Sequence, residues 1–239
     1  FSPVILVIAV ATVVTMLIYW AISALFFRQD AAETMAGAAS SSYYNSVNIG
    51  LPIATYVLGD ATFVVPALVL QMAVLSPIVI AGLDRGAKGV GKSVVAGLTA
   101  PVVVAAFAGF AVSAASWTVP EPVLAPLEIL GGASIPLILM SFGASLTGEK
   151  VLTSHRGPTI TATALKLVGM PAVAWVVATL LGLDGQEMYA ALILCALPTA
   201  QNVYNYAATY RSGEVICRDT VFLTTFLALP AMLLIAGVF

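Results

Sequence analysis

The sequence has very little charge. Asp, Glu, Lys and Arg make up only 8% of its 239 residues, whereas they make up about 25% of an ordinary soluble domain. Hydrophobic residues account for 61% of the chain, compared with about 45–50% in soluble domains. The net charge of −2 is too small to indicate nucleic acid as a partner. This composition excludes a soluble domain and predicts a protein that is embedded in the lipid bilayer.

Residues suited to catalysis or metal binding are also scarce. The two cysteines, Cys195 and Cys217, lie in or beside apolar runs without metal-ligand spacing, so we interpret them as small apolar side chains. The single histidine, His155, has no triad, zinc cluster or carboxylate pair beside it. We therefore expect no enzyme activity and no metal or other cofactor.

The chain does contain long apolar segments. A helix needs about 20 residues to cross roughly 30 Å of hydrocarbon, and several segments reach this length. We predict an all-α membrane protein. Its eight transmembrane helices are expected at residues 4–27, 34–58, 61–83, 93–117, 123–147, 158–182, 187–210 and 216–238.

The basic residues decide the number of helices. The segment 34–58 has a polar centre, but only if it is counted as a helix do all basic loop residues fall on one side of the membrane, which is then cytoplasmic. Both chain ends are thus predicted on the non-cytoplasmic side of the plasma or inner membrane. The chain starts in an apolar run without a Met or a basic leader, so we expect an N-terminal part to be missing. The basic residues outside apolar runs are Arg28, Arg85, Lys88, Lys92, Lys150, Arg156, Arg211 and Arg218.

The helices fall into two groups. A basic cytoplasmic linker, 84–92, separates residues 1–83, with three helices, from residues 93–239, with five. The helices at 34–58 and 187–210 are each second from the end of their group, carry an interior proline, and cross in opposite directions. Secondary transporters are commonly built from such inverted repeats with interrupted helices. If the repeat has five helices, the first repeat here lacks two.

The two interrupted helices also carry the strongest candidate site. Proline removes a helical donor and frees carbonyl groups that lipid cannot satisfy, and it favours the start of a new helix. We expect two half-helix N-termini to converge near the midplane and to bind an anion such as a carboxylate. The alternative is a pair of proline kinks that hold helices together. The candidate residues are Asn45, Asn48, Gly50 and Pro52 in the first helix, and Pro198, Thr199, Gln201 and Asn202 in the second.

Two charged residues lie inside predicted helices. Lys166 is about 13 Å inside the helix 158–182, where it could serve as a counter-charge to an anion, act as a proton-linked group, or extend to the interface. Glu128 is close to one end of the helix 123–147, as an interfacial carboxylate or as a group that couples transport to Na+ or H+. The glycine-rich segment 131–136 on the same helix is interpreted as a site of close packing.

At these residues the chain resembles the auxin efflux carrier family, which includes bacterial relatives described as malonate transporters. Residues 45–52 are similar to the family's N-x-x-x-x-G-x-P segment, 131–146 to its G-G-x-x-x-P…G-x-x-L helix, and 197–202 to its P-T-A-x-N segment. Lys166 followed by Pro171 fits the next helix of the family. The resemblance implies a ten-helix fold of two inverted five-helix repeats, of which this chain has the last eight, and it is compatible with a homodimer.

The resemblance also implies a function. We expect an alternating-access carrier of a small organic anion, in which a domain with crossing broken helices moves against a scaffold. Asn45 and Asn202 would contact the substrate, while Lys166 would supply positive charge nearby. Val47 stands where many relatives carry glycine, and Asn48 is an additional amide, so the resemblance to one relative alone does not identify the substrate. The alternatives are a sodium-coupled symporter of the bile-acid type, a carboxylate-binding membrane receptor without transport, and a truncated product without function.

Overall fold

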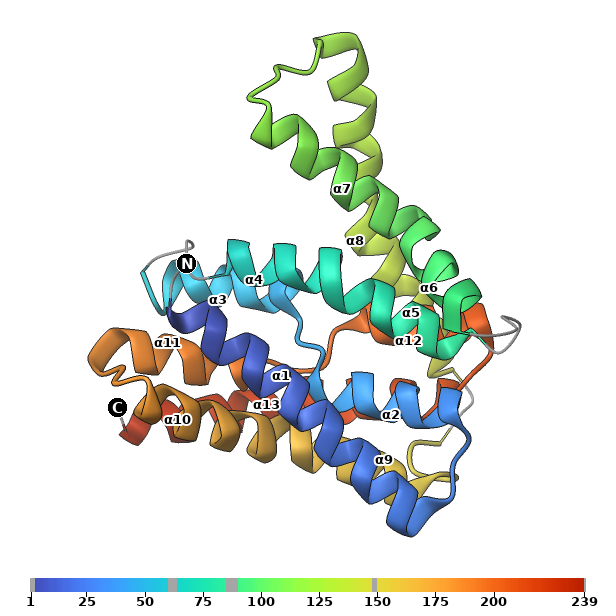
Figure 1. Ribbon diagram of the computed structural model, residues 1–239, viewed down its shortest axis with the longest axis vertical. Coiled ribbons are helices and arrows are strands. Elements are labelled where there is room, and N and C mark those ends of the chain that lie inside the picture. The colour runs from blue at the N-terminus through green and yellow to red at the C-terminus, as the bar shows by residue number, and fades with distance from the viewer. Residues whose placement is uncertain (1–2, 60–63, 85–89, 148–149, 239) are drawn as a thin grey trace.

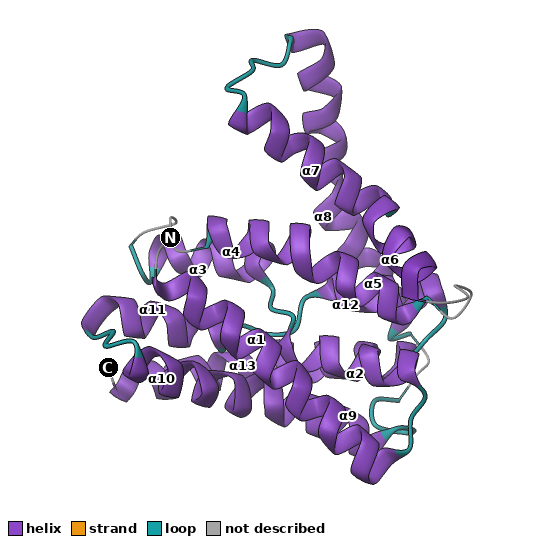
Figure 2. Ribbon diagram, in the orientation of Figure 1, coloured by secondary structure: helices purple, strands orange, loops and turns teal. Residues whose placement is uncertain are grey.

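Helices make up all regular secondary structure in the described part of the chain. The computed structural model describes residues 3–59, 64–84, 90–147 and 150–238, so most of the predicted linker 84–92 lies outside the described residues. No strand occurs in these ranges (Figure 2), and the prediction of an all-α fold is confirmed. The α-helices are α1 (Pro3–Ile22), α2 (Ala31–Ser42), α3 (Leu51–Tyr56), α4 (Val65–Leu70), α5 (Ser76–Leu83), α6 (Val90–Thr99), α7 (Pro101–Ala114), α8 (Glu121–Ser145), α9 (Arg156–Ala164), α10 (Met170–Leu180), α11 (Gly185–Cys195), α12 (Gln201–Tyr210) and α13 (Glu214–Val238).

Short π-helical turns, which are wider than α-helical turns, join several of these helices. Three of them are each followed by a proline in the second residue of the next helix: Pro52, Pro77 and Pro171. In an α-helix the proline ring would clash with the carbonyl four residues earlier. That residue lies within the wider turn in all three cases, so each helix continues through its proline. The π-helical turns are η1 (Ser23–Phe27), η2 (Ser46–Gly50), η4 (Gln71–Leu75) and η5 (Leu165–Gly169).

Four helical stretches in the described residues are long and apolar enough to cross a membrane. They are Pro3–Phe27, Pro66–Leu83, Arg156–Leu180 and Glu214–Val238. Their mean hydropathy lies between 1.7 and 2.6. These stretches make the chain an integral membrane protein. The eight-helix count is not decided by this criterion.

A body of tightly packed helices forms the larger part of the molecule (Figure 1). Its main core joins α1, α10, α11 and α13, and many of its buried residues are alanines, which allow helices to approach closely. The start of α1 and the end of α13 lie at the same end of this body (Figure 1).

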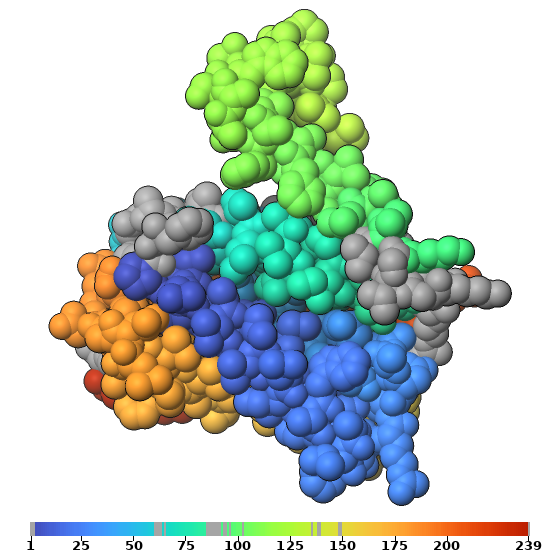
Figure 3. Space-filling view, viewed as in Figure 1, coloured from blue at the N-terminus to red at the C-terminus, as the bar shows by residue number. Residues whose placement is uncertain are grey.

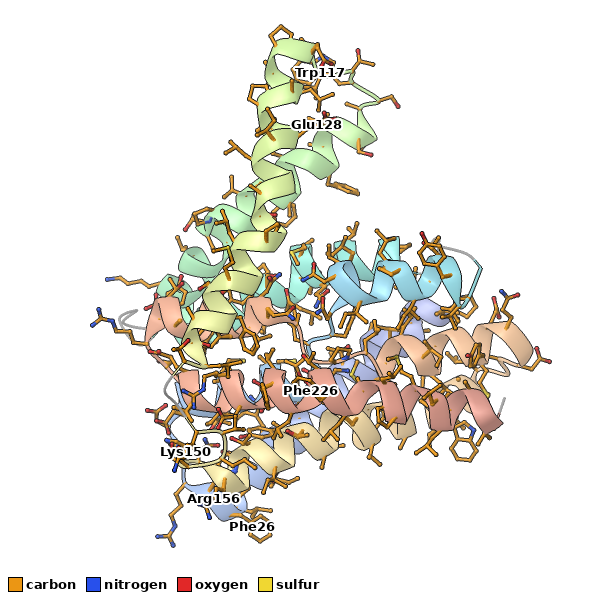
Figure 4. All side chains as sticks on the ribbon, turned by 180° about the vertical axis from the view of Figure 1, so that it is seen from behind. Phe26, Trp117, Glu128, Lys150, Arg156 and Phe226 are labelled. Carbon is orange, nitrogen blue, oxygen red and sulfur yellow. The ribbon has the colours of Figure 1, made fainter. Side chains whose placement is uncertain are left out.

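A hairpin formed by α7 and α8 projects from the body (Figure 3). Large apolar side chains along it, including Phe110, Leu130 and Met140, are exposed. In a membrane protein such surfaces face lipid. Glu128 is exposed near the far end of the hairpin, beside the region of Trp117 (Figure 4).

The close packing predicted for residues 131–136 is wrong for its glycines. A Cβ atom added at Gly131 or Gly132 would meet no atom within 4 Å. Close approach occurs elsewhere, between α5 and α6. There, a Cβ atom at Gly97 would overlap the backbone carbonyl oxygen of Pro77. Small residues in a membrane helix therefore do not by themselves identify the contact.

Replacing Gly97 by alanine should separate α5 from α6. Because the obstructing atom belongs to the backbone, we expect Gly97→Ala to cost about 1–3 kcal/mol. The matched control, Gly131→Ala, should be neutral or stabilise by about 0.5–1 kcal/mol, because alanine is the better helix former. Thermal unfolding of the purified protein in detergent measures both. Equal melting temperatures for the two variants would contradict the packing described for Gly97.

Candidate functional site

Both helices that were predicted to be broken are interrupted in the structure. The first stops at Ser42 and resumes with η2 at Ser46, and the second stops at Cys195 and resumes with α12 at Gln201. We call the two linking segments, residues 43–45 and 196–200, the crossover. They run antiparallel and meet at a β-bridge between Tyr44 and Thr199.

The expectation that each proline starts a half-helix is wrong. The first half-helix begins at Ser46, six residues before Pro52, because Asn45 caps it: the Asn45 Oδ1 accepts the backbone N–H of Asn48 at 3.2 Å. In the second helix, Pro198 lies within the link, three residues before α12 begins. An asparagine cap in one helix and a proline in the other therefore produce the same kind of break.

Backbone hydrogen bonds join the two links. The N–H of Asn45 donates to the carbonyl of Pro198 at 2.9 Å, and the N–H of Ala200 donates to the carbonyl of Tyr43 at 3.2 Å. Each link thus supplies the partners that the other lost when its helix was interrupted. Such pairing is needed at membrane depth, where water does not satisfy backbone groups.

Thr199 and Gly50, two of the predicted site residues, support the crossover. The Thr199 hydroxyl donates to the carbonyl of Ser40 at 2.6 Å, and its N–H donates to the hydroxyl of Thr224 at 3.1 Å. A Cβ atom at Gly50 would approach Leu197 Cδ1 to 2.9 Å, so only glycine fits there without a shift. Pro52 is exposed and lies outside these contacts.

Gln71 in η4 also holds the crossover, and the sequence analysis did not identify it. Its Nε2 donates to the carbonyl of Tyr44 at 2.6 Å, and its Oε1 accepts the hydroxyl of Ser46. The side chain is buried, with 1% exposed. An isolated glutamine in an otherwise apolar span was a signal that could have pointed to this role.

A cavity of about 140 Å³ opens beside the crossover. The structure brings four of the predicted amide side chains to it, from both broken helices. The Gln201 Oε1 accepts hydrogen bonds from Asn45 Nδ2 at 2.8 Å and from Asn48 Nδ2 at 3.4 Å. The lining residues are Tyr44, Asn45, Ser46, Val47, Asn48, Gln71, Met72, Ser134, Ala200, Gln201 and Asn202.

The cavity presents hydrogen-bond donors, and none of its described lining residues is charged. Two half-helices, 46–56 and 201–210, begin at its wall. Within the described residues, no protein acceptor is found for the backbone N–H groups of Val47, Gln201 and Asn202. The side-chain amide of Asn202 also has no hydrogen-bond partner there. Free N–H groups and the positive ends of helix dipoles favour an anion. The site is therefore chemically suited to a carboxylate.

Lys166 and Glu128 are not part of the cavity wall. Lys166 is completely buried, so the alternative in which it extends to the interface is wrong. Its ammonium group donates to the backbone carbonyl of Cys195 at 2.6 Å and contacts Met170 Sδ at 3.2 Å. The structure therefore places the Lys166 amino group at the end of α11. It places Glu128 on the projecting hairpin (Figure 4).

The comparison with known families agrees with this architecture. Residues 88–236, more than half of the chain, match a family described as "Membrane transport protein". The chain belongs to this family. It is the auxin efflux carrier family that the three sequence segments indicated, so the resemblance is confirmed.

Two relatives in other organisms carry names that refer to transport. A Rhizobium meliloti protein named "Putative malonate transporter" is 26% identical over 233 residues, which cover 92% of this chain and 72% of that protein. An uncharacterized transporter of Methanocaldococcus jannaschii is 28% identical over 107 residues, 45% of this chain and 34% of its own length. The archaeal match thus spans about a third of that relative.

Substitution of Gln71 by leucine should destabilise the crossover. The change leaves the Ser46 hydroxyl without a partner and leaves the Tyr44 carbonyl with only the N–H of Ser46. A buried unsatisfied group costs about 1–3 kcal/mol. The control is Gln186→Leu, which also removes one hydrogen bond to a backbone carbonyl, that of Leu58, but from an exposed side chain. The melting temperature should fall clearly for Gln71→Leu and only slightly for Gln186→Leu. An equal fall in both variants would contradict the role of Gln71 in holding the crossover.

Proposed function

We propose that this protein is a secondary active transporter that carries a small organic anion, such as a carboxylate, by alternating access. The main support for this proposal is the uncharged cavity at the crossover. Two half-helix N-termini and four amide side chains surround it. Only a ligand that accepts hydrogen bonds satisfies such donors, and an anion gains in addition from both helix dipoles. Asn45, Asn48, Gln201 and Asn202 would bind the substrate.

The size of the cavity supports a small substrate. Its volume of about 140 Å³ is below the roughly 300–1,000 Å³ of pockets that hold drug-sized ligands. A dicarboxylate of the size of malonate suits this space better than an aromatic acid such as indole acetate. The name of the Rhizobium meliloti relative refers to malonate, and we extend this substrate class to the present chain as part of the proposal.

The proposed movement takes place between the hairpin and the body. Ser134 of α8 is on one side of the cavity, whereas the other lining residues belong to the body. A neighbouring groove of about 310 Å³ between α4, η4 and α7 is lined mainly by apolar residues. Few polar contacts would have to break if the body slid along the hairpin. This sliding would open the cavity to one side of the membrane and then to the other.

The proposed topology has eight transmembrane helices in two inverted repeats, residues 1–83 and 93–239, that derive from a ten-helix fold. Both chain ends would be non-cytoplasmic. In support, α1 starts and α13 ends at one end of the body (Figure 1), whereas Lys150 and Arg156 lie at the opposite end (Figure 4). A gradient of the substrate, or of coupled Na+ or H+, would drive transport.

Loss of the Asn202 amide should impair transport without unfolding the protein. Its side chain lines the cavity and has no protein partner in the described residues, so a bound anion would be its main contact. We expect Asn202→Ala to lower kcat/KM for malonate flux in proteoliposomes at least tenfold, because a hydrogen bond to a charged group contributes about 1.5–3 kcal/mol. Asn202→Asp should lower kcat/KM further, because the new carboxylate would repel the anionic substrate.

The matched control is Asn205→Ala. Asn205 is on the same helix and is equally half-buried, but it lines a different cavity, between α12 and α8. This variant should keep wild-type flux. If Asn202→Ala transports normally, or if Asn205→Ala is impaired to the same extent, the site is misassigned. Tight malonate binding without any flux would favour a receptor.

Competition by carboxylates of increasing size tests the proposed substrate class. Unlabelled malonate and other carboxylates of two to four carbons should inhibit labelled malonate uptake, and indole acetate at equal concentration should inhibit weakly, because the cavity does not hold a bicyclic ring. Stronger inhibition by indole acetate than by malonate would overturn the size argument. A neutral control of malonate size, malonamide, should not compete if charge is required.

A further inference from the structure

The Lys166 side chain places a buried amino group in the middle of a membrane-spanning stretch. It lies in η5, between α9 and α10, and none of its surface is exposed. In the described part of the chain no carboxylate pairs with it, and its hydrogen bonds go to the Cys195 carbonyl oxygen and to Met170 Sδ. An unpaired charge in this position is costly, so the group must be stabilised by something other than an acidic side chain.

The stabilising partner is the C-terminus of α11. Cys195 is the last residue of that half-helix, and helix C-termini carry partial negative charge from carbonyl groups without intrahelical partners. The contact is short, at 2.6 Å, and short distances are typical of charge-assisted hydrogen bonds. A protonated Lys166 would neutralise the negative end of α11 at the point where the second broken helix is interrupted.

Among the residues that the structure describes, no such cation lies at the first broken helix. Its first half, α2, ends at Ser42, and neutral groups cover the carbonyls there: Thr199 donates its hydroxyl to Ser40, and Ala200 donates its N–H to Tyr43. Within the described ranges, of the two half-helix C-termini at the crossover, the one at Cys195 alone contacts a lysine from a neighbouring helix. Lys166 thus has a specific place beside one break.

In carriers with discontinuous helices, the C-terminal ends of half-helices and their unwound carbonyls are positions at which coupling Na+ or H+ binds. We infer that the ammonium group of Lys166 is a resident cation that occupies this position at the end of α11, so that transport does not require Na+ there. The inference rests on the proposed transport function and adds to it the role of Lys166. Lys166 is then a positioning residue: it holds α11 at the crossover and does not touch the substrate.

The test compares flux with and without sodium. Malonate uptake into proteoliposomes is measured in Na+ medium and in choline medium at one pH, for the wild type, Lys166→Met, Lys166→Ala, and the surface control Lys150→Met. We expect wild-type and Lys150→Met flux to change less than twofold when choline replaces Na+. In choline medium, malonate flux through Lys166→Met and Lys166→Ala should be at least tenfold below wild-type flux. Propylammonium, which fits the space left by the truncated side chain, should restore Lys166→Ala flux at least fivefold, and tetramethylammonium should not.

A second readout does not depend on transport. The melting temperature of Lys166→Ala in detergent should be below that of the wild type and should rise on addition of propylammonium but not of choline, whereas Lys150→Met should respond to neither. If no anion is transported by the wild type, the proposed function fails and this measurement still decides the role of Lys166. Strict sodium dependence of the wild type, full choline-medium flux of Lys166→Met, or absence of any propylammonium effect on Lys166→Ala would each overturn the inference.

Discussion

The need to satisfy backbone groups inside the membrane governs this structure. Two helices are interrupted at the same depth, and an isolated break would leave N–H and carbonyl groups without partners. The bridge between Tyr44 and Thr199, with the hydrogen bonds beside it, pairs the two links with each other. Gln71 supplies a further donor from a neighbouring helix. Each break thus supplies hydrogen-bond partners to the other.

The interruption of both helices also brings the partial charges of their ends to the crossover. Each interrupted helix presents a negative C-terminal end and a positive N-terminal end within the protein. The N-terminal ends meet the cavity with its amide groups, where the proposed anion would be the complementary ligand. One C-terminal end meets the ammonium group of Lys166. Substrate and lysine would therefore be stabilised by opposite ends of the broken helices, although the lining residues that the structure describes are all uncharged.

Much of this arrangement could be predicted from the sequence, because its causes are local. Length and hydropathy predict membrane helices, and the polar segments around Asn45 and Asn202 predict interruptions. The start of the first half-helix was placed wrongly because capping by Asn45 precedes Pro52, and π-helical turns let three prolines continue their helices. The partner of Lys166 and the role of Gln71 depend on which helices are neighbours in space. Neither hydropathy nor residue spacing contains that information.

The central claim is that a carboxylate binds at the N-terminal end of α12. Solid-state NMR on the protein in lipid, with ¹³C-carboxylate malonate and ¹⁵N-labelled asparagine, measures the distance between a malonate carboxyl carbon and the Asn202 backbone nitrogen directly. The account predicts that the Asn202 backbone nitrogen lies within about 4 Å of a malonate carboxyl carbon, as a hydrogen bond to the carboxylate requires. Saturating malonate that leaves the Asn202 signal without dipolar coupling to the label would contradict it.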